Sequence, residues 1–473
     1  MNPILLINAH GPLHGQAFTC VRFPLVLGML GAQAAAAGYH CELLDFAAHG
    51  YDAQAFGAHV AEAAPAMAVV LFETPAAPAA HAVAQAVKAH CPGALTVACG
   101  PHATALPEST LRQFPSFDAA LTGEPDETFA ELCRAVDQGL APSGIAGLAY
   151  RAGGQVVVEA PRPAPDDLDA LPRPARVLRP PQAYSGTFPV HFLQRGPRLC
   201  AVEVETMRGC PYNCSFCAAN SCAGSNTRFR SVSSVTAEIE DLVETFGADT
   251  IVFTDPVFVL HRPRVEALCE QLRRMGVRWT CRAAPHLVDE AMLARMAGAG
   301  CRHILFTIPS GDDDVLVRVN APFTVDQART AMAAARTAGI PTVEARMFVG
   351  AHPSETRAQV RATWNLAQAL AIDVLDARLA VPLPGSPLYL AMAKRSLILE
   401  NQWVRFVPWG ADPPWRTEHF APADLARMQA AMMRAFYQNK ARRRARLRRL
   451  MSLCSWRLEN RIMAQYINSL PKA

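Results

Sequence analysis

Three cysteines in one short segment have the spacing of a metal site. Cys210, Cys214 and Cys217 form a C-x3-C-x2-C pattern within residues 207–220. Cysteine thiolates hold iron–sulfur clusters, usually four to a 4Fe-4S cluster. No fourth cysteine follows at a matching spacing, so three ligands would leave one iron open to a substrate or cofactor. Cys222, five residues further on, is interpreted as a packed thiol.

Two other interpretations of these cysteines stay open at this point. Structural zinc normally takes four ligands, often from two paired C-x2-4-C hooks, and the chain has no second hook. Free cysteine is also a common core residue, and the chain contains 14 cysteines. The tight spacing, directly after a strand-like run, favours the cluster.

The cysteine segment resembles that of the radical S-adenosylmethionine (SAM) enzymes, including the aromatic residue Phe216 before the last cysteine. The resemblance implies that the three cysteines hold a 4Fe-4S cluster. It also implies that the open iron binds the amino and carboxylate groups of SAM, and that reduction cleaves SAM to a 5′-deoxyadenosyl radical.

Length and composition indicate a globular chain of two to four domains, since it has 473 residues, 51% hydrophobic and 18% charged. The net charge of +4 conceals seven basic residues within 440–449. The remainder has more acidic than basic residues and is not a general nucleic-acid binder. No secretory signal and no apolar run of 18 residues are present, so we expect a cytoplasmic protein with reduced thiols.

Residues 1–140 alternate strand-like and helical stretches. The strand candidates are residues 4–8, 41–46, 68–72, 95–99 and 118–122. Such alternation predicts a doubly wound parallel sheet, which binds ligands at the carboxyl ends of its strands. Polar loops follow the first, third and fourth strands. Gly100, in the last of these, permits a close backbone approach.

This region resembles the cobalamin-binding domain that precedes many radical SAM cores. The matching residues are Pro24-Leu25, the stretch 100–108 and Thr122-Gly123-Glu124. The resemblance implies cobalamin contacts at His10, Thr74, Gly100, Pro101, His102, Thr104, Gly123 and Glu124. Leu13 stands where the Asp-x-His-x-x-Gly pattern needs glycine. We therefore expect cobalamin without its own base on cobalt and without a histidine replacing it; loss of cobalamin remains the alternative.

Residues 141–195 are predicted to be a proline-rich connector that begins with a hairpin around Gly153-Gly154 and braces its neighbours. Strand and helix alternate again over 196–389, in six units typical of a partial (β/α)6 barrel. The cysteine loop follows the first strand of this barrel. It is therefore expected at the carboxyl ends of the strands, where such folds do chemistry.

The resemblance to radical SAM cores extends through this barrel and implies SAM contacts at Phe216, Asp255, Arg282, Ser310, Arg318 and Arg346. Pro309 and Pro256 stand where related enzymes carry acids. The barrel interior is therefore expected to be poor in acids, which weakly favours an apolar substrate. A structural role remains the alternative for each arginine.

Residues 390–473 change character and are predicted to be helical and basic. One face of the pattern is apolar and the other is rich in arginine. Such a helix can contact an anionic membrane surface peripherally, or its apolar face can pack on the barrel.

Together these features resemble the cobalamin-dependent radical SAM enzymes. The resemblance implies methylation of an unactivated carbon in a small-molecule or lipid-like biosynthetic intermediate, with flavodoxin or ferredoxin as the external electron donor. Two alternatives remain. One is radical cyclisation, rearrangement or oxidation without methyl transfer, and the other is a non-catalytic cobalamin or iron–sulfur binding protein.

Overall fold

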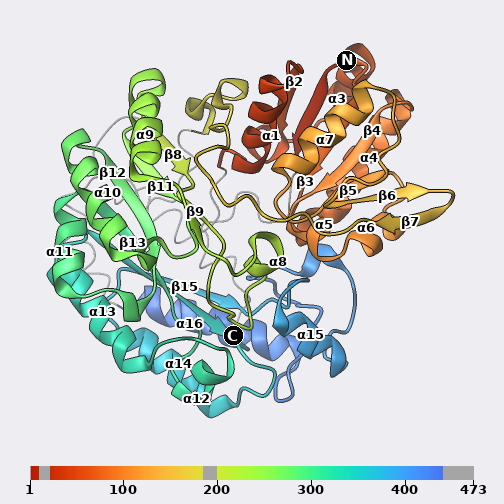
Figure 1. The fold of residues 1–473 in the computed structure, drawn as a ribbon. Helices are drawn as coiled ribbons and strands as arrows, with labels where there is room; N and C mark the ends of the chain where they lie inside the picture. Colours follow the sequence, from red (N-terminus) through yellow and green to blue (C-terminus); the bar gives the residue numbers. More distant parts are fainter. Residues whose placement is uncertain (1, 10–21, 185–199, 440–473) are drawn as a thin grey trace.

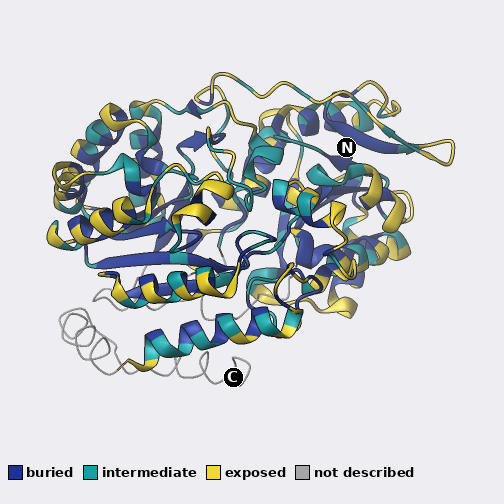
Figure 2. Cartoon of the chain, turned by 90° about the horizontal axis from the view of Figure 1, so that it is seen from below, coloured by how far each residue is buried: buried dark blue, intermediate teal, exposed yellow. Residues whose placement is uncertain are grey.

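The computed structural model describes residues 2–9, 22–184 and 200–439. Two sheets, one mostly and one wholly parallel, each with helices against it, make up most of the chain (Figure 1). Most strand residues are buried, and exposed residues gather on the outward sides of the helices (Figure 2). The predicted α/β fold, a doubly wound sheet followed by a partial barrel, is confirmed.

The first sheet has seven strands in the order β2-β1-β3-β4-β5-β6-β7. Its parallel part consists of β1 (Ile4–Asn8), β2 (Cys41–Asp45), β3 (Met67–Leu71), β4 (Leu95–Cys99) and β5 (Ala119–Leu121). The main helices on it are α1 (Leu25–Ala36), α3 (Ala53–Ala63), α4 (Ala77–His90) and α7 (Asp126–Asp137). The strands are almost wholly apolar because helices cover both faces. The order 2-1-3-4-5 puts the topological switch point between β1 and β3, where such sheets bind ligands.

The predicted hairpin in the connector is an extension of this sheet. Strands β6 (Leu148–Ala152) and β7 (Gln155–Val158) are antiparallel, and β6 pairs with β5. Gly153 and Gly154 both have positive φ, as a tight two-residue turn requires. The sheet therefore continues beyond residue 140.

The second sheet has six parallel strands in the order β15-β14-β13-β12-β11-β8. These are β8 (Ala201–Val204), β11 (Thr250–Phe253), β12 (Arg278–Ala283), β13 (Cys301–Thr307), β14 (Thr342–Val349) and β15 (Val374–Leu379). The helices between them are α9 (Val232–Phe246), α10 (Arg262–Met275), α11 (Glu290–Gly298), α12 (Asp313–Arg318), α13 (Val325–Thr337) and α14 (Arg357–Ala369). Strands β8 and β15 are not paired with each other in the described structure, so the barrel is open.

The chain beyond the barrel folds back onto both sheets. Helices α15 (Pro387–Lys394) and α16 (Pro422–Gln438) flank the short helix η7 (Trp403–Arg405). Helix α16 packs on β15, where the Gln429 amide donates a hydrogen bond to the Ala377 carbonyl (2.7 Å). Helix α16 is the described part of the predicted C-terminal helical region, whereas the basic window 440–449 and the residues up to 473 lie outside the described residues. Within the described chain, no helix combines the length and the apolar character needed to cross a membrane.

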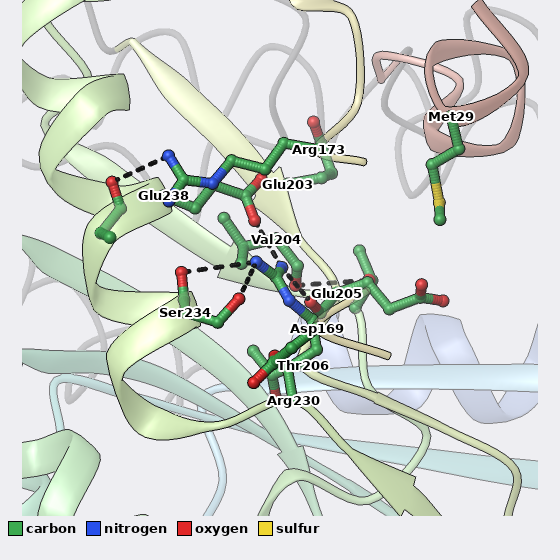
Figure 3. Close-up of polar contacts among 12 residues, drawn as sticks. Met29, Asp169, Arg173, Glu203, Val204, Glu205, Thr206, Arg230, Ser234 and Glu238 are labelled. Atoms are coloured by element: carbon green, nitrogen blue, oxygen red, sulfur yellow. Dashed lines mark hydrogen bonds and ion pairs between the residues drawn. The ribbon is translucent and has the colours of Figure 1, made fainter. Parts of the chain in front are cut away.

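A buried arginine of the connector forms hydrogen bonds with the first strand and the first helix of the barrel. Arg176 donates from Nη1 to Glu238 Oε1 on α9 (2.7 Å) and from Nη2 to the Glu203 carbonyl (2.5 Å). Its guanidinium also lies 5.8 Å from the ring centroid of Phe23, beside the first sheet. Arg230 reinforces the same corner by donating to the Glu205 carbonyl and to Ser234 (Figure 3).

Candidate functional site

The cysteine loop is closed at its base by a small hairpin that sequence reasoning missed. Strand β9 (Met207–Arg208) pairs antiparallel with β10 (Arg228–Phe229), and the three cysteines lie between them. Two-residue strands give too short an alternation to be recognised in sequence. The loop nevertheless leaves the carboxyl end of β8, as expected.

Hydrogen bonds from two parts of the barrel hold the loop. The Ser215 N–H donates to the Val319 carbonyl (3.0 Å), and the Ser215 carbonyl accepts from the Leu388 N–H (2.7 Å). The Asn320 amide donates to the Asn213 carbonyl (3.0 Å). The loop is thus tied to the segments after β13 and β15.

The donor set of the loop fits an iron–sulfur cluster. Burial, with smaller contributions from the neighbouring Cys217 and Cys210, raises the pKa of the Cys214 thiol to about 12. The Ala219 N–H donates to Cys217 Sγ (3.5 Å), a contact that would stabilise a thiolate. No three metal-binding side chains of the described residues are close enough together to hold a single metal ion. The loop therefore supplies three thiols, and they do not form a site for a single metal ion.

Gly209 is required immediately before the first cysteine. Its φ is +80°, and a Cβ there would lie 2.1 Å from the Asn226 carbonyl oxygen. L-residues other than glycine rarely adopt this conformation, and here they would also collide with the backbone.

Asp255 fixes the backbone that enters the loop. Its buried carboxylate accepts from the N–H groups of Thr206 (2.7 Å) and Met207 (3.2 Å), and from the Thr206 hydroxyl. Both of its oxygens are engaged by the chain itself. The structure thus places this predicted SAM residue in support of the cysteine loop.

Two further predicted SAM residues form hydrogen bonds with neighbouring parts of the barrel. The buried Ser310 hydroxyl pairs with Thr363 Oγ1 (3.1 Å) on α14. Arg318 is exposed, and its Nη1 donates to Ser354 Oγ (3.0 Å). Phe216, in contrast, packs on Phe348 at the end of β14, with ring centroids 4.8 Å apart.

Arg282 and Arg346 come together inside the barrel, with a third arginine that was not predicted. Arg346 on β14 and Arg378 on β15 each donate from Nε to Asp376 Oδ2 (2.8 Å). Burial and the charges of Arg346 and Arg378 lower the pKa of Arg282 to about 10, and Arg22 adds to this. Asp376 and Arg378 lie two residues apart on the last strand and so share one face of it. This spacing was the sequence signal from which Arg378 could have been predicted.

The expectation of an acid-poor interior is wrong. Glu203, Glu344 and Asp376 are buried on barrel strands, and Glu205 follows β8. Pro309 and Pro256 stand in place of acids at two strand ends. The four buried or strand-end carboxylates come from other strands, where side-chain alternation directs them inward.

The predicted cobalamin residues cluster at the ends of β3, β4 and β5. His102 Nδ1 lies 3.2 Å from Thr74 Oγ1, and burial lowers the pKa of His102 to about 4. Thr104 Oγ1 accepts from the Gly123 N–H (3.2 Å). Pro101 is exposed in the first turn of α5 (Pro101–Ala105), and His10 lies outside the described residues.

Two members of this set serve the protein's own packing. A Cβ at Gly100 would lie 2.5 Å from the Phe72 carbonyl oxygen, so glycine lets β4 leave the sheet beside β3. Glu124 forms ion pairs with Arg208 (2.9 Å) and Arg228, the arginines on either side of the cysteine loop. Glu124 therefore joins the first sheet to the loop.

This boundary is strongly charged and buried. Arg208 also pairs with Asp126 (2.7 Å) at the start of α7 and with Glu205 (2.9 Å). The short helix α8 (Ala219–Ala223), which follows the last cysteine, packs on α5. The cysteine loop and the loops after β4 and β5 are therefore direct neighbours.

Comparisons with known families match both halves of the chain. The model described as the radical SAM superfamily covers residues 204–366, and the model described as the B12 binding domain covers residues 22–133. An uncharacterized methyltransferase of Pyrococcus horikoshii is 30% identical over 360 residues, covering 76% of this chain and 75% of the relative. The anaerobic magnesium-protoporphyrin IX monomethyl ester cyclase of Rubrivivax gelatinosus is 27% identical over 376 residues, covering 78% of this chain and 65% of the cyclase.

Solved structures share the whole fold at low sequence identity. The radical SAM methyltransferase TsrM from Kitasatospora setae, with cobalamin and a 4Fe-4S cluster bound, gives a TM-score of 0.71 at 18% identity and covers 99% of both chains. The cobalamin-dependent radical SAM enzyme OxsB gives 0.73 at 14% identity and covers 98% of this chain and 70% of OxsB. The chain therefore belongs to the cobalamin-binding radical SAM enzymes, the family that works with a 4Fe-4S cluster, SAM and cobalamin.

Proposed function

We propose that this enzyme methylates an unactivated carbon of a small-molecule or lipid-like biosynthetic intermediate. The observation that carries the proposal is the contact between α8 and α5, which joins the cysteine loop to the cobalamin-binding loops. Gly385 lies at the same junction, where a Cβ would be 2.5 Å from Ser221 Oγ and 3.2 Å from Ala105 Cβ. A radical generated at one loop and a methyl group carried at the other would therefore reach one substrate.

The chain's own residues bind and orient the reactants in this proposal. When bound, the cluster and SAM supply the radical, and cobalamin supplies the methyl group. Cys210, Cys214 and Cys217 would hold the cluster, and Phe216 next to the last cysteine packs on Phe348. The ion pairs between Arg208, Arg228 and Glu124 fix the distance between the two cofactor loops. Flavodoxin or ferredoxin is the proposed electron donor, and the cytoplasm the proposed location.

Product analysis under anaerobic conditions tests the proposal. Reconstituted protein would receive SAM, hydroxocobalamin and a strong reductant, with Cys214→Ala as the control. We expect 5′-deoxyadenosine from the wild type and none from the variant, with S-adenosylhomocysteine formed only when cobalamin is present. Equal release of 5′-deoxyadenosine by both proteins would contradict radical chemistry at this loop.

The balance of the two products identifies the reaction once a substrate turns over. Methylation of an unactivated carbon requires both 5′-deoxyadenosine and S-adenosylhomocysteine for each product. Methylation without 5′-deoxyadenosine would indicate an activated, nucleophilic carbon. Product formation with 5′-deoxyadenosine alone would support the second candidate, radical cyclisation, rearrangement or oxidation, which the similarity to the Rubrivivax gelatinosus cyclase favours.

A further inference from the structure

Two arginines on neighbouring barrel strands share a single carboxylate oxygen. Arg346 and Arg378 both donate from Nε to Asp376 Oδ2, each over 2.8 Å. Their terminal nitrogens make no hydrogen bond in the described part of the chain, and each side chain is 22% exposed. Among the described residues, Arg282 donates only to the Thr254 carbonyl, over a long 3.4 Å. The guanidinium edges best suited to bind an anion are therefore left available.

The strand register brings these arginines to one region of the barrel interior. Arg346 is opposite Asp376 in the β14–β15 pair and opposite Thr307 in the β13–β14 pair. Arg378 is opposite Phe348, the residue that packs on Phe216 of the cysteine loop. The arginine cluster, defined as Arg282, Arg346 and Arg378, thus lies near the carboxyl ends of β12, β14 and β15.

Other carboxylates of the barrel lie beside a basic group of their own, although Glu203 Oε1 has no hydrogen-bond partner among the described residues. Glu203 Oε1 lies 3.7 Å from Arg22 Nε, and Glu205 Oε2 lies 2.9 Å from Arg208 Nε. Glu344 Oε2 lies 2.8 Å from His303 Nε2. Asp376 is then the one acid bonded to the arginine cluster among the described residues, so the cluster carries an excess of positive charge.

Confining three like charges away from bulk water is costly unless an anion joins them. Burial lowers the pKa of Arg378, as it does for Arg282, and the charge of Arg346 acts in the same direction. Desolvation raises the pKa of the Glu73 carboxyl, two residues after β3 in the cobalamin-binding domain, and the nearby charge of Arg378 opposes that rise. The cluster therefore borders the cobalamin side of the barrel.

We propose that the arginine cluster binds an anionic group of the substrate, a carboxylate or a phosphate. This inference rests on the proposed function and narrows its substrate class. A cation–π contact orients Arg378, since its guanidinium lies over the Trp409 ring at 4.5 Å from the centroid. In this family the open iron binds the SAM carboxylate, so that carboxylate does not require three further cations.

Thermal unfolding of the cluster- and cobalamin-loaded enzyme at saturating SAM tests this proposal. The added probes are inorganic phosphate, succinate and the neutral analogue succinamide. We expect phosphate or succinate, but not succinamide, to raise the melting temperature of the wild type. Whichever of the two anions acts at the lower concentration identifies the group that the site prefers.

Matched variants show whether the anion-dependent rise in melting temperature arises at the arginine cluster. Arg378→Gln should raise the half-saturating anion concentration about tenfold, and Arg378→Lys, which keeps the charge and the fold, should raise it less. Arg302→Gln, on an exposed position of β13, should match the wild type. An absent anion shift in the wild type, or an undiminished one in Arg378→Gln, would overturn the proposal.

Two parallel measurements distinguish binding of a substrate anion from binding of SAM and from methyl transfer. If Arg378→Gln weakens SAM binding but leaves the anion shift intact, the arginine cluster serves the SAM carboxylate and the proposal fails. The release of 5′-deoxyadenosine and S-adenosylhomocysteine by the wild type is measured on the same samples. Failure of methyl transfer is therefore distinguishable from failure of anion binding.

Discussion

Glu355, in the turn after β14, is a buried acid with one unsatisfied oxygen. Its Oε2 accepts from the Ala351 N–H (3.0 Å), while Oε1 has no partner among the described residues. Burial raises the pKa of this carboxyl to about 8. The folded state therefore holds the proton more tightly than the unfolded chain does.

Stability should fall as the pH rises through this range, because the folded protein binds more protons than the unfolded one between about pH 5 and pH 8. The slope for one such group is at most about 1.4 kcal/mol per pH unit. Glu355→Gln should flatten the dependence of the melting temperature on pH, measured by circular dichroism. Glu240→Gln, an exposed change on α9, should leave it as in the wild type. Identical pH profiles for wild type and Glu355→Gln would refute this.

Gly209 offers a second prediction for a single residue. Gly209→Ala should cost more than about 1 kcal/mol and lower the iron and sulfide bound per chain after anaerobic reconstitution. The physical reason is the collision with the Asn226 carbonyl. Gly224→Ala is the matched control, since Gly224 also has positive φ but a Cβ there meets nothing within 4 Å. Equal losses in both variants would assign the effect to backbone conformation alone.

At the level of elements, the β9–β10 hairpin joins the cysteine loop to the cobalamin-binding domain. Arg208→Gln would leave Asp126 buried without its cation and Glu124 with Arg228 alone, a loss of about 3–5 kcal/mol. The melting temperature should fall by several degrees, and the double variant Arg208→Gln/Asp126→Asn should recover part of the loss. Arg112→Gln breaks an exposed pair with Glu108 and should change stability by less than about 1 kcal/mol. If the stability losses of Arg208→Gln and Asp126→Asn simply added in the double variant, direct coupling between the two side chains would be excluded.

At the level of the whole molecule, the connector fixes the barrel against the first sheet through Arg176. Arg176→Gln should leave Glu238 paired with Arg230 alone and detach the connector, so limited proteolysis should cut residues 159–184 faster. Arg173→Gln serves as the control, because Arg173 is exposed and makes one long contact (3.3 Å) with the Ala237 carbonyl. Unchanged cleavage of the Arg176 variant would show that other contacts hold the connector.

Local patterns predicted much of this molecule. The strands of both sheets follow from short apolar runs between helical stretches, and their order in the chain predicted parallel sheets. The spacing of Cys210, Cys214 and Cys217 lies within one loop, so it predicted a three-thiol site without knowledge of the fold. The β9–β10 hairpin was missed because two-residue strands carry too little alternation to be recognised.

Side-chain partners were decided by the tertiary structure. Glu124 meets Arg208, and Arg346 and Arg378 meet at Asp376, through strand register and domain packing. The resemblance predicted Asp255 as a SAM contact, and this stays a prediction; the structure adds that its carboxylate accepts hydrogen bonds from the N–H groups of Thr206 and Met207. The sequence by itself determined the elements and the cluster loop, since these depend on neighbours along the chain. The charge of the barrel interior depends on residues tens of positions apart, so only the folded chain could decide it.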